Sequence, residues 1–316
     1  MPRLYPPGMR KLLRILPVRW IGNENRFKEL ADLKVRLNGG ALHVAADAGL
    51  TDACKYLVEG LKLDVNAKDS LEDIQPHLNT PLTVSAMKGH TATSKYLLEH
   101  GAAIPYDRDF RALHFAAENG DFEVMKFLLE KGVSVDLRNA AVQGTPLSSA
   151  AHRSREDVVK FLLERGANPN GHPEDICTPL QTAAEAGSFA CSELLIKAGA
   201  DPNLVYRGCN PLHSAAYDGN VEIINLLLQA GANPDVTHMF DYHVHDDQEG
   251  GYKSMKPIEI AALQGHNEAV EILFPITKPI YKIKEWSIDG ILDEMQLRKK
   301  GRKRGQPKSR ISTRLL

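Results

Sequence analysis

The sequence of 316 residues predicts an all-α solenoid of about seven helix–turn–helix units, each followed by a short β-turn finger. The main observation is an internal repeat of roughly 33 residues. It is marked by apolar anchor residues whose successive separations are 40, 31, 34, 33, 32 and 46 residues. The composition agrees, because 6% aromatic residues is low for an enzyme built around one large core. The anchors are Leu42, Leu82, Leu113, Leu147, Leu180, Leu212 and Ile258.

The elements of one unit follow from the order of its residues. Thr178–Leu180 opens the unit, and proline at the second position suits the first turn of a helix because its φ is already helical. The pair Ala183–Ala184 lets this short first helix approach its neighbours, and Gly187 ends it. A longer second helix then carries the apolar run Leu194–Ile196 and stops at Gly199. The following Asp-Pro-Asn has the chemistry of a turn and leads into the finger.

This pattern resembles the ankyrin repeat, and the resemblance covers roughly residues 40–274. It implies a β-turn and two helices per unit. It also implies that the histidine after the anchor leucine is a structural residue, which ties the turn of its repeat to the neighbouring repeat. Those histidines are His43, His114 and His213.

The two ends of the chain lie outside this pattern. Residues 22–39 look like the second half of a degenerate unit, so we expect an N-terminal cap there. Residues 1–21 form a basic segment that we expect to be disordered or docked on the cap, a transit peptide being the alternative. Residues 275–297 are expected to form a linker, and residues 298–316 a basic disordered tail.

The expected linker has a narrower resemblance. Phe274–Thr277, Pro279–Ile280 and Glu285–Ile291 are similar to the linker that follows the array in a group of plant ankyrin–tetratricopeptide proteins. In that group a tetratricopeptide domain follows, but no such unit fits here, since the chain turns basic after Glu294. Chaperone binding through that domain is therefore not expected of this chain.

The charge is unevenly distributed along the chain. The first 21 residues hold five basic residues and no acidic ones, and residues 298–316 hold nine basic and no acidic ones. Residues 22–297 therefore carry a formal charge of −15. The tail is a disordered segment without a dedicated role, a nuclear import signal, or a contact for RNA, DNA or acidic lipid. The candidate import residues are Lys299, Lys300, Arg302, Lys303 and Arg304.

The four cysteines do not indicate a disulfide framework. Cys177 and Cys209 occupy the same position in successive repeats, on the order of 10 Å apart, which is too far for a bridge. Cys54 and Cys191 are expected to be small core residues. Reduced cysteines predict a cytoplasmic location, with the nucleus as the alternative. No apolar run reaches the ~18 residues needed to cross a membrane.

The finger 236–255 is rich in histidine and carboxylate side chains. We expect a solvated loop, because the residues lack the helical spacing of a catalytic zinc site. An adventitious metal site and a functional one are the alternatives. The residues concerned are His238, Asp241, His243, His245, Asp246, Asp247 and Glu249.

We therefore predict a monomeric, non-catalytic scaffold that binds another protein, with no cofactor, metal or small-molecule substrate. Signatures of a nucleophile elbow, a phosphate loop and a dinucleotide site are absent from the sequence. The partner should present a basic face to the acidic body. Polyanion binding through the tail is the alternative function, and an enzyme using the histidine-rich finger is a third.

The partner surface should be the concave face, where outward positions flank each alanine pair. Met87, Phe115 and Tyr217 are expected to contribute most binding energy. The predicted partner-binding residues are Val44, Asp47, Val84, Met87, Phe115, Glu118, Ser149, His152, Thr182, Glu185, Ser214 and Tyr217.

Overall fold

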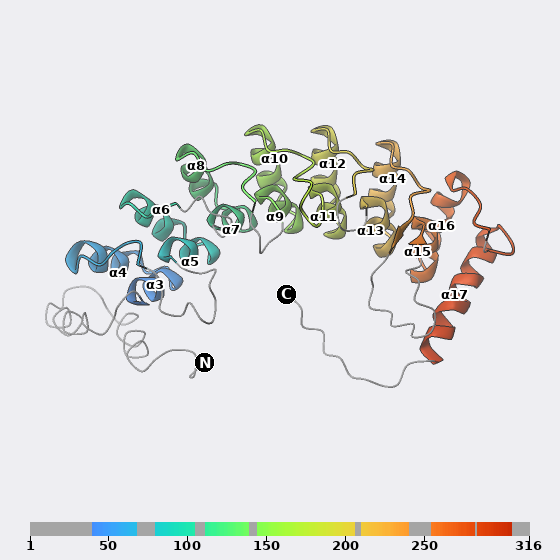
Figure 1. Ribbon diagram of the computed structural model, residues 1–316, viewed down its shortest axis with the longest axis horizontal. Helices are drawn as coiled ribbons and strands as arrows, with labels where there is room; N and C mark the ends of the chain where they lie inside the picture. The colour runs from blue at the N-terminus through green and yellow to red at the C-terminus, as the bar shows by residue number, and fades with distance from the viewer. Residues whose placement is uncertain are drawn as a thin grey trace. The chain divides into compact units, whose positions relative to one another are not determined.

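The structure is a computed structural model of the chain, and it consists of helix pairs that confirm the predicted all-α solenoid (Figure 1). The chain forms two compact units. Unit 1 comprises residues 1–150 and 160–167, and unit 2 comprises residues 151–159 and 168–316. The structure describes residues 40–67, 80–104, 111–138, 144–205, 210–239, 254–281 and 283–304.

Unit 1 contains three complete helix pairs within the described residues. The first helices pack against one another from pair to pair, and so do the second helices, which gives two layers. The second helix of the first pair continues as a π-helix, η2 (Tyr56–Gly60). The helices are α3 (Gly40–Asp47), α4 (Thr51–Lys55), α5 (Pro81–Met87), α6 (Thr91–Glu99), α7 (Ala112–Asn119) and α8 (Phe122–Glu130).

Unit 2 repeats this two-layer arrangement and ends in a long helix. The strands β1 (His238–Met239) and β2 (Ser254–Met255) pair antiparallel, with His238 opposite Met255. The boundary between the units falls within α9 (Pro146–His152) and α10 (Glu156–Glu164). The other helices are α11 (Pro179–Glu185), α12 (Phe189–Lys197), α13 (Pro211–Asp218), α14 (Val221–Gln229), α15 (Pro257–Gln264), α16 (Asn267–Leu273), the 3-10 helix η3 (Phe274–Ile276) and α17 (Ile288–Arg304).

Side-chain caps fix where the first helices begin. Thr178 Oγ1 accepts a hydrogen bond from the backbone N–H of Gln181 at 3.0 Å, and Asn210 Oδ1 accepts one from His213 at 3.0 Å. Each cap precedes a proline at the first helical position, as predicted. The expected Gly187 stop is also confirmed, with φ of +66° in the left-handed region.

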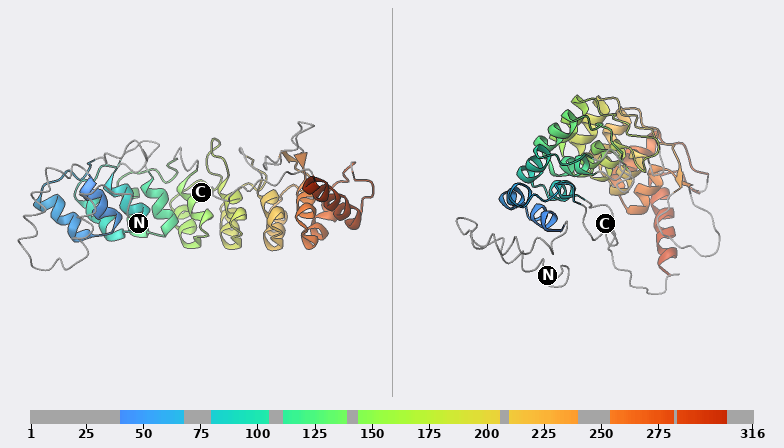
Figure 2. Two further views of the ribbon diagram at one scale, coloured as in Figure 1. Left: turned by 90° about the horizontal axis from the view of Figure 1, so that it is seen from below. Right: turned by 60° about the vertical axis from the view of Figure 1, so that its left-hand side comes forward.

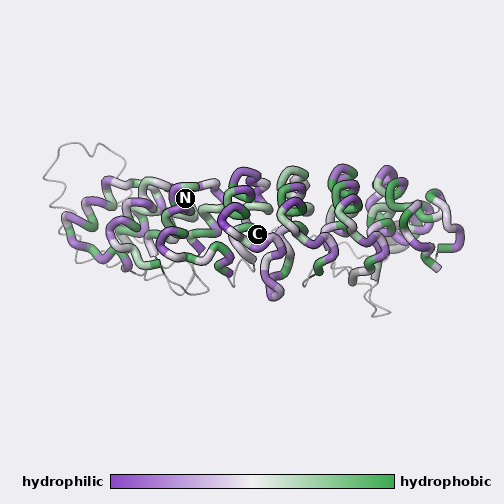
Figure 3. The backbone as a smooth tube through the Cα atoms, turned by 90° about the horizontal axis from the view of Figure 1, so that it is seen from above, coloured by the Kyte–Doolittle hydropathy of each residue, from purple (hydrophilic) through white to green (hydrophobic). Residues whose placement is uncertain are grey.

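The core lies between neighbouring helix pairs. All seven anchor residues have an exposed fraction of 0%, which confirms the period found in the sequence. Figure 3 shows hydrophobic and hydrophilic segments alternating along the helices, as expected where one side of each helix is buried. Cys54 and Cys191 are buried free thiols, as predicted.

Two buried histidines each tie their repeat to the next one. His114 Nε2 donates to the carbonyl of Gly144 at 3.1 Å, and His213 Nε2 donates to the carbonyl of Met255 at 3.0 Å. Both acceptors directly precede the opening turn of the following repeat. The structural role expected for His114 and His213 is therefore confirmed.

The fingers of unit 2 are linked to one another by a ladder of polar side chains. Asn170 Oδ1 accepts from the backbone N–H of Asp201 at 2.8 Å, and Asn203 Oδ1 accepts from that of Asn233 at 2.7 Å. Each finger thereby fixes the backbone of the next one along the chain.

The last rung of this ladder reaches beyond the array. Asp235 Oδ1 accepts from the backbone N–H of Lys278 at 2.9 Å and from Lys256 Nζ at 2.6 Å. Lys256 Nζ also donates to the carbonyl of Lys278 at 2.8 Å. The segment after the last helix pair is therefore held in place by specific hydrogen bonds.

The C-terminal part differs from the expected linker and disordered tail. The helix α17 crosses the expected boundary at residue 297 and packs on α15, beside which Figures 1 and 2 also place it. Ile291 and Met295 are 0% exposed, and Arg298 lies 3.9 Å from the Glu259 carboxylate. The spacing of four residues puts both apolar side chains on one helix face, which covers the last repeat. This part of the chain is a C-terminal cap.

Several predicted segments lie outside the described residues. They are residues 1–21, the expected N-terminal cap 22–39, residues 240–253 of the histidine-rich finger and residues 305–316.

We predict that Ser154→Gly raises the free energy of unfolding by about 0.5 kcal/mol. Ser154 has φ of +53°, whereas glycine stands at the corresponding turn in the other described repeats. Relief of a left-handed serine exceeds the extra entropy that glycine gains on unfolding. Urea unfolding measures the change, and Ser154→Ala is the control, because alanine keeps the strain. An equal gain in both variants would contradict the explanation.

We predict that stability falls as the pH drops from about 6.5 to about 4. Burial lowers the pKa of His114 to about 4, and nearby Arg111 lowers it further. The unfolded chain therefore binds a proton on this ring at a higher pH than the folded chain does. The stability contribution is complete above pH 6.5, and up to about 3 kcal/mol is lost toward pH 4.

Urea unfolding across this pH range measures the loss. His114→Gln should flatten part of the slope, because glutamine naturally stands at this position in another repeat as Gln181. The exposed His172→Ala is the control and should leave the slope unchanged. Identical slopes in all three proteins would exclude His114 as the cause.

We predict that Met295→Ala lowers the free energy of unfolding by about 2–4 kcal/mol, since it leaves a cavity between α17 and α15. Leu297→Ala is the matched control on the same helix, because Leu297 is 64% exposed. It should change stability by less than about 0.5 kcal/mol. Thermal unfolding of both variants tests the cap, and equal effects would show that α17 does not seal the array.

Candidate protein-interaction surface

The predicted partner-binding residues all lie on first helices. In each of the first six repeats they occupy two positions, two and five residues after the anchor. The helices that carry them are α3, α5, α7, α9, α11 and α13. We call the exposed side of these helices the first-helix surface, and we describe its parts in unit 1 and unit 2 separately.

Burial divides the predicted residues into two groups. Val44, Val84, Ser149 and Ser214 have exposed fractions of 4–7%, so they contribute to packing between repeats. They stand two residues after the anchor and directly before a pair of small residues, which is Ala-Ala in three repeats and Ser85–Ala86 after Val84. The remaining residues are partly or fully exposed and make up the surface. These are Asp47, Met87, Phe115, Glu118, His152, Thr182, Glu185 and Tyr217.

In unit 1, the first-helix surface combines charge with large apolar side chains. Asp47 lies 3.7 Å from Lys88 Nζ, and both side chains are well exposed. Met87 and Phe115 are partly exposed on the neighbouring helices α5 and α7. An exposed ion pair of this kind contributes little to stability, so these side chains remain available for a partner.

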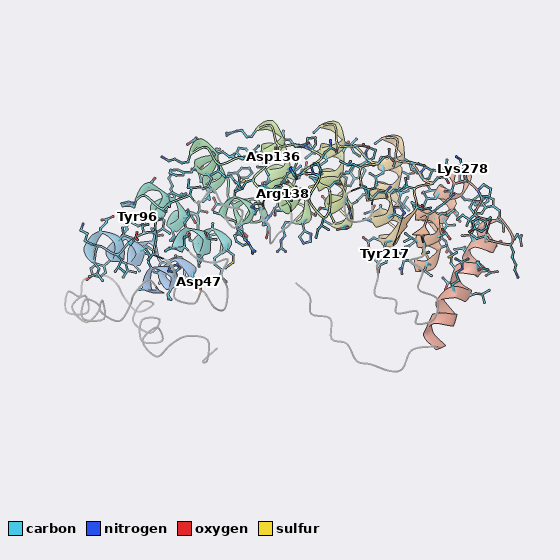
Figure 4. The ribbon with its side chains drawn as sticks, in the orientation of Figure 1. Asp47, Tyr96, Asp136, Arg138, Tyr217 and Lys278 are labelled. Atoms are coloured by element: carbon cyan, nitrogen blue, oxygen red, sulfur yellow. The ribbon has the colours of Figure 1, made fainter. Side chains whose placement is uncertain are left out.

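In unit 2, a carboxylate on this surface is held in a fixed orientation. Glu185 Oε1 accepts from Gln181 Nε2 at 2.9 Å, on the same helix, and from Ser214 Oγ at 3.4 Å, on α13. Tyr217 occupies on α13 the position that Glu185 has on α11. Figure 4 labels Tyr217 in unit 2 and Asp47 in unit 1, each beside its first helix.

A second carboxylate in unit 2 ends the helix that carries Tyr217. Burial raises the pKa of Asp218, and His266 opposes this shift. His266 Nε2 also donates to the carbonyl of Tyr217 at 3.0 Å, so the helix end is fixed by the next repeat. Gln181 and Asp218 were both missed from sequence. A signal for Gln181 was present, because histidine stands at this position in three other repeats.

The described residues do not form a recognisable reactive centre. No group of three or more metal-binding side chains occurs among them, and no helix in this part of the chain is long and apolar enough to cross a membrane. Burial raises the pKa of Cys54 to about 12 and raises that of Cys191, so both thiols stay protonated. His238 begins β1, while the other histidines and carboxylates named in the histidine-rich finger lie outside the described residues.

The basic cluster at residues 299–304 lies on the last turns of α17. Its backbone is helical, in contrast to the disorder expected for this segment. The assignment of these residues to nuclear import stays a prediction.

Known proteins show the same architecture. The family model described as ankyrin repeats (3 copies) matches residues 42–139, 105–173 and 147–238. The structure of the human ASB11 ankyrin repeat domain aligns with a TM-score of 0.57 and 26% identity, covering 73% of this chain and 96% of that one.

Curated relatives match over shorter regions. The human transient receptor potential cation channel subfamily A member 1 is 29% identical over 164 residues, which is 51% of this chain and 14% of the channel. The ankyrin repeat and KH domain-containing protein mask-1 of Caenorhabditis elegans is 29% identical over 133 residues, which is 42% of this chain and 5% of that protein. This chain thus matches only a small part of either relative. Because the family model matches more than half of the sequence and the solved fold agrees, the chain belongs to the ankyrin repeat family.

Proposed function

We propose that this protein is a non-catalytic scaffold that binds another protein on its first-helix surface. Ankyrin repeats are generally protein-interaction modules. The observation that carries the proposal is the partial exposure of Met87, Phe115 and Tyr217 on helices whose other apolar residues are buried. Large apolar and aromatic side chains of this kind contribute most to binding energy at protein interfaces.

The charge of the surface supports a partner with a basic face. Carboxylates occupy the position five residues after the anchor in three repeats, at Asp47, Glu118 and Glu185. Residues 22–297 carry a formal charge of −15, which attracts basic partners over distances of about 10 Å at moderate salt. Association should therefore be faster at low ionic strength.

We further propose that the protein is a monomer located in the cytoplasm, with the nucleus as a second location if the basic cluster on α17 acts as an import signal. The proposed cytoplasmic location rests on the reduced cysteines, and the nuclear alternative rests on the basic cluster in the sequence.

The test is affinity purification with mass spectrometry, comparing the full chain with a Phe115→Ala/Tyr217→Ala double variant. We expect the double variant to recover its partners about tenfold less, because it loses both aromatic contacts. Phe189→Ala is the matched control, since Phe189 is 40% exposed on a second helix, α12. Full recovery by the double variant would contradict the proposed surface.

A third variant separates the surface from the basic cluster. Replacing Lys299, Lys300, Arg302, Lys303 and Arg304 by glutamine removes their charge and keeps good helix formers in α17. Partner recovery should be unchanged. If recovery is lost here and retained in the aromatic double variant, the protein acts through its basic cluster as a polyanion binder.

A further inference from the structure

Three repeats carry a histidine one residue after the anchor, whereas Thr83, Ser148, Gln181 and Glu259 stand there in the others. His114 and His213 each donate forward to a carbonyl at the opening of the next repeat, at 3.1 Å and 3.0 Å. Gln181 stands at the same position in its own repeat, one residue after the anchor leucine. Its Nε2 donates instead to Glu185 Oε1 within α11. The side chain that elsewhere ties repeats together here orients a surface carboxylate.

This arrangement leaves a buried acceptor unused. Gln181 is 1% exposed, and its Oε1 has no hydrogen-bond partner among the described residues. A buried amide oxygen without a donor is unfavourable, and such an unpaired group in a folded protein calls for an explanation. The unpaired oxygen belongs to the amide group that orients Glu185.

Glu185 is itself exposed and lacks a cation partner. None of the ion pairs between described residues includes it, whereas the equivalent Asp47 in unit 1 pairs with Lys88. The hydrogen bond from Ser214 Oγ draws the carboxylate toward α13, the helix that carries Tyr217. The site therefore has an exposed carboxylate oriented by Gln181 and Ser214, and an aromatic residue on the adjacent helix.

We infer that Glu185 receives an arginine side chain of the protein partner, with Gln181 and Ser214 orienting the carboxylate. A guanidinium carries several N–H donors and no acceptor, so it complements an exposed carboxylate without a cation partner. Its planar face also stacks on tyrosine, which favours arginine over lysine. The inference rests on the proposed function and names the chemistry of the partner at one position.

The test is an NMR titration of the full chain with N-acetyl-arginine N-methylamide, observing the side-chain amide of Gln181. We expect a saturable shift with a dissociation constant on the order of millimolar. The uncharged isostere N-acetyl-citrulline N-methylamide and N-acetyl-lysine N-methylamide should each bind at least about tenfold more weakly. Glu185→Gln should weaken arginine binding by a similar factor.

Two control variants make the result specific. Glu222→Gln removes one exposed charge elsewhere in unit 2 and should leave the titration unchanged. Gln181→His introduces the residue found in three other repeats and should weaken binding, followed at the backbone amide of Glu185, with a melting temperature close to that of the unaltered chain. Equal shifts with citrulline or lysine, or an unchanged titration in Glu185→Gln, would overturn the inference.

The partner purification distinguishes this inference from the proposed function. If Phe115→Ala/Tyr217→Ala loses the partners and Glu185→Gln retains all of them, the first-helix surface stands and the arginine site fails. If the aromatic double variant retains its partners, the proposed function itself fails.

Discussion

The rest of the structure depends on one constraint: a single helix pair is too small to bury its own apolar side. Each anchor residue reaches 0% exposure only because helices of neighbouring repeats cover it. The short loops, the alanine pairs and the glycine stops all serve this close approach. Polar contacts such as those of His114 and His213 then fix the spacing, because they satisfy backbone carbonyls that the stacking would otherwise bury unpaired.

The same constraint explains how much could be predicted from sequence. The helix pairs follow from a sequence motif that recurs many times at a regular spacing, which chance similarity in a single segment would not produce. The cap at α17 occurs once and has no period. Its signal was the spacing of Ile291 and Met295, which a short linker resemblance obscured. The buried state of Val44 and Val84 was also missed, because the repeat fixes which helix a residue lies on more firmly than it fixes how closely the neighbouring helix approaches.

The candidate surface could likewise be predicted only in part from the sequence. The helices that form it follow from the repeat, and Phe115 and Tyr217 on these helices are partly exposed. The bonds from Gln181 and Ser214 to Glu185 depend on side-chain conformations at two helices, which no single-repeat pattern encodes. The residues that the repeats share serve packing. The positions at which the repeats differ are therefore the ones available for binding.

Burial of Cys54 and Cys191 gives the protein an internal reporter of local opening. Cys54 lies in unit 1 and Cys191 in unit 2, and the raised pKa of each thiol suppresses the thiolate that reacts with alkylating reagents. Either thiol becomes reactive when its own surroundings unfold. The rate of modification at each cysteine thus measures the opening equilibrium of one unit without any introduced label.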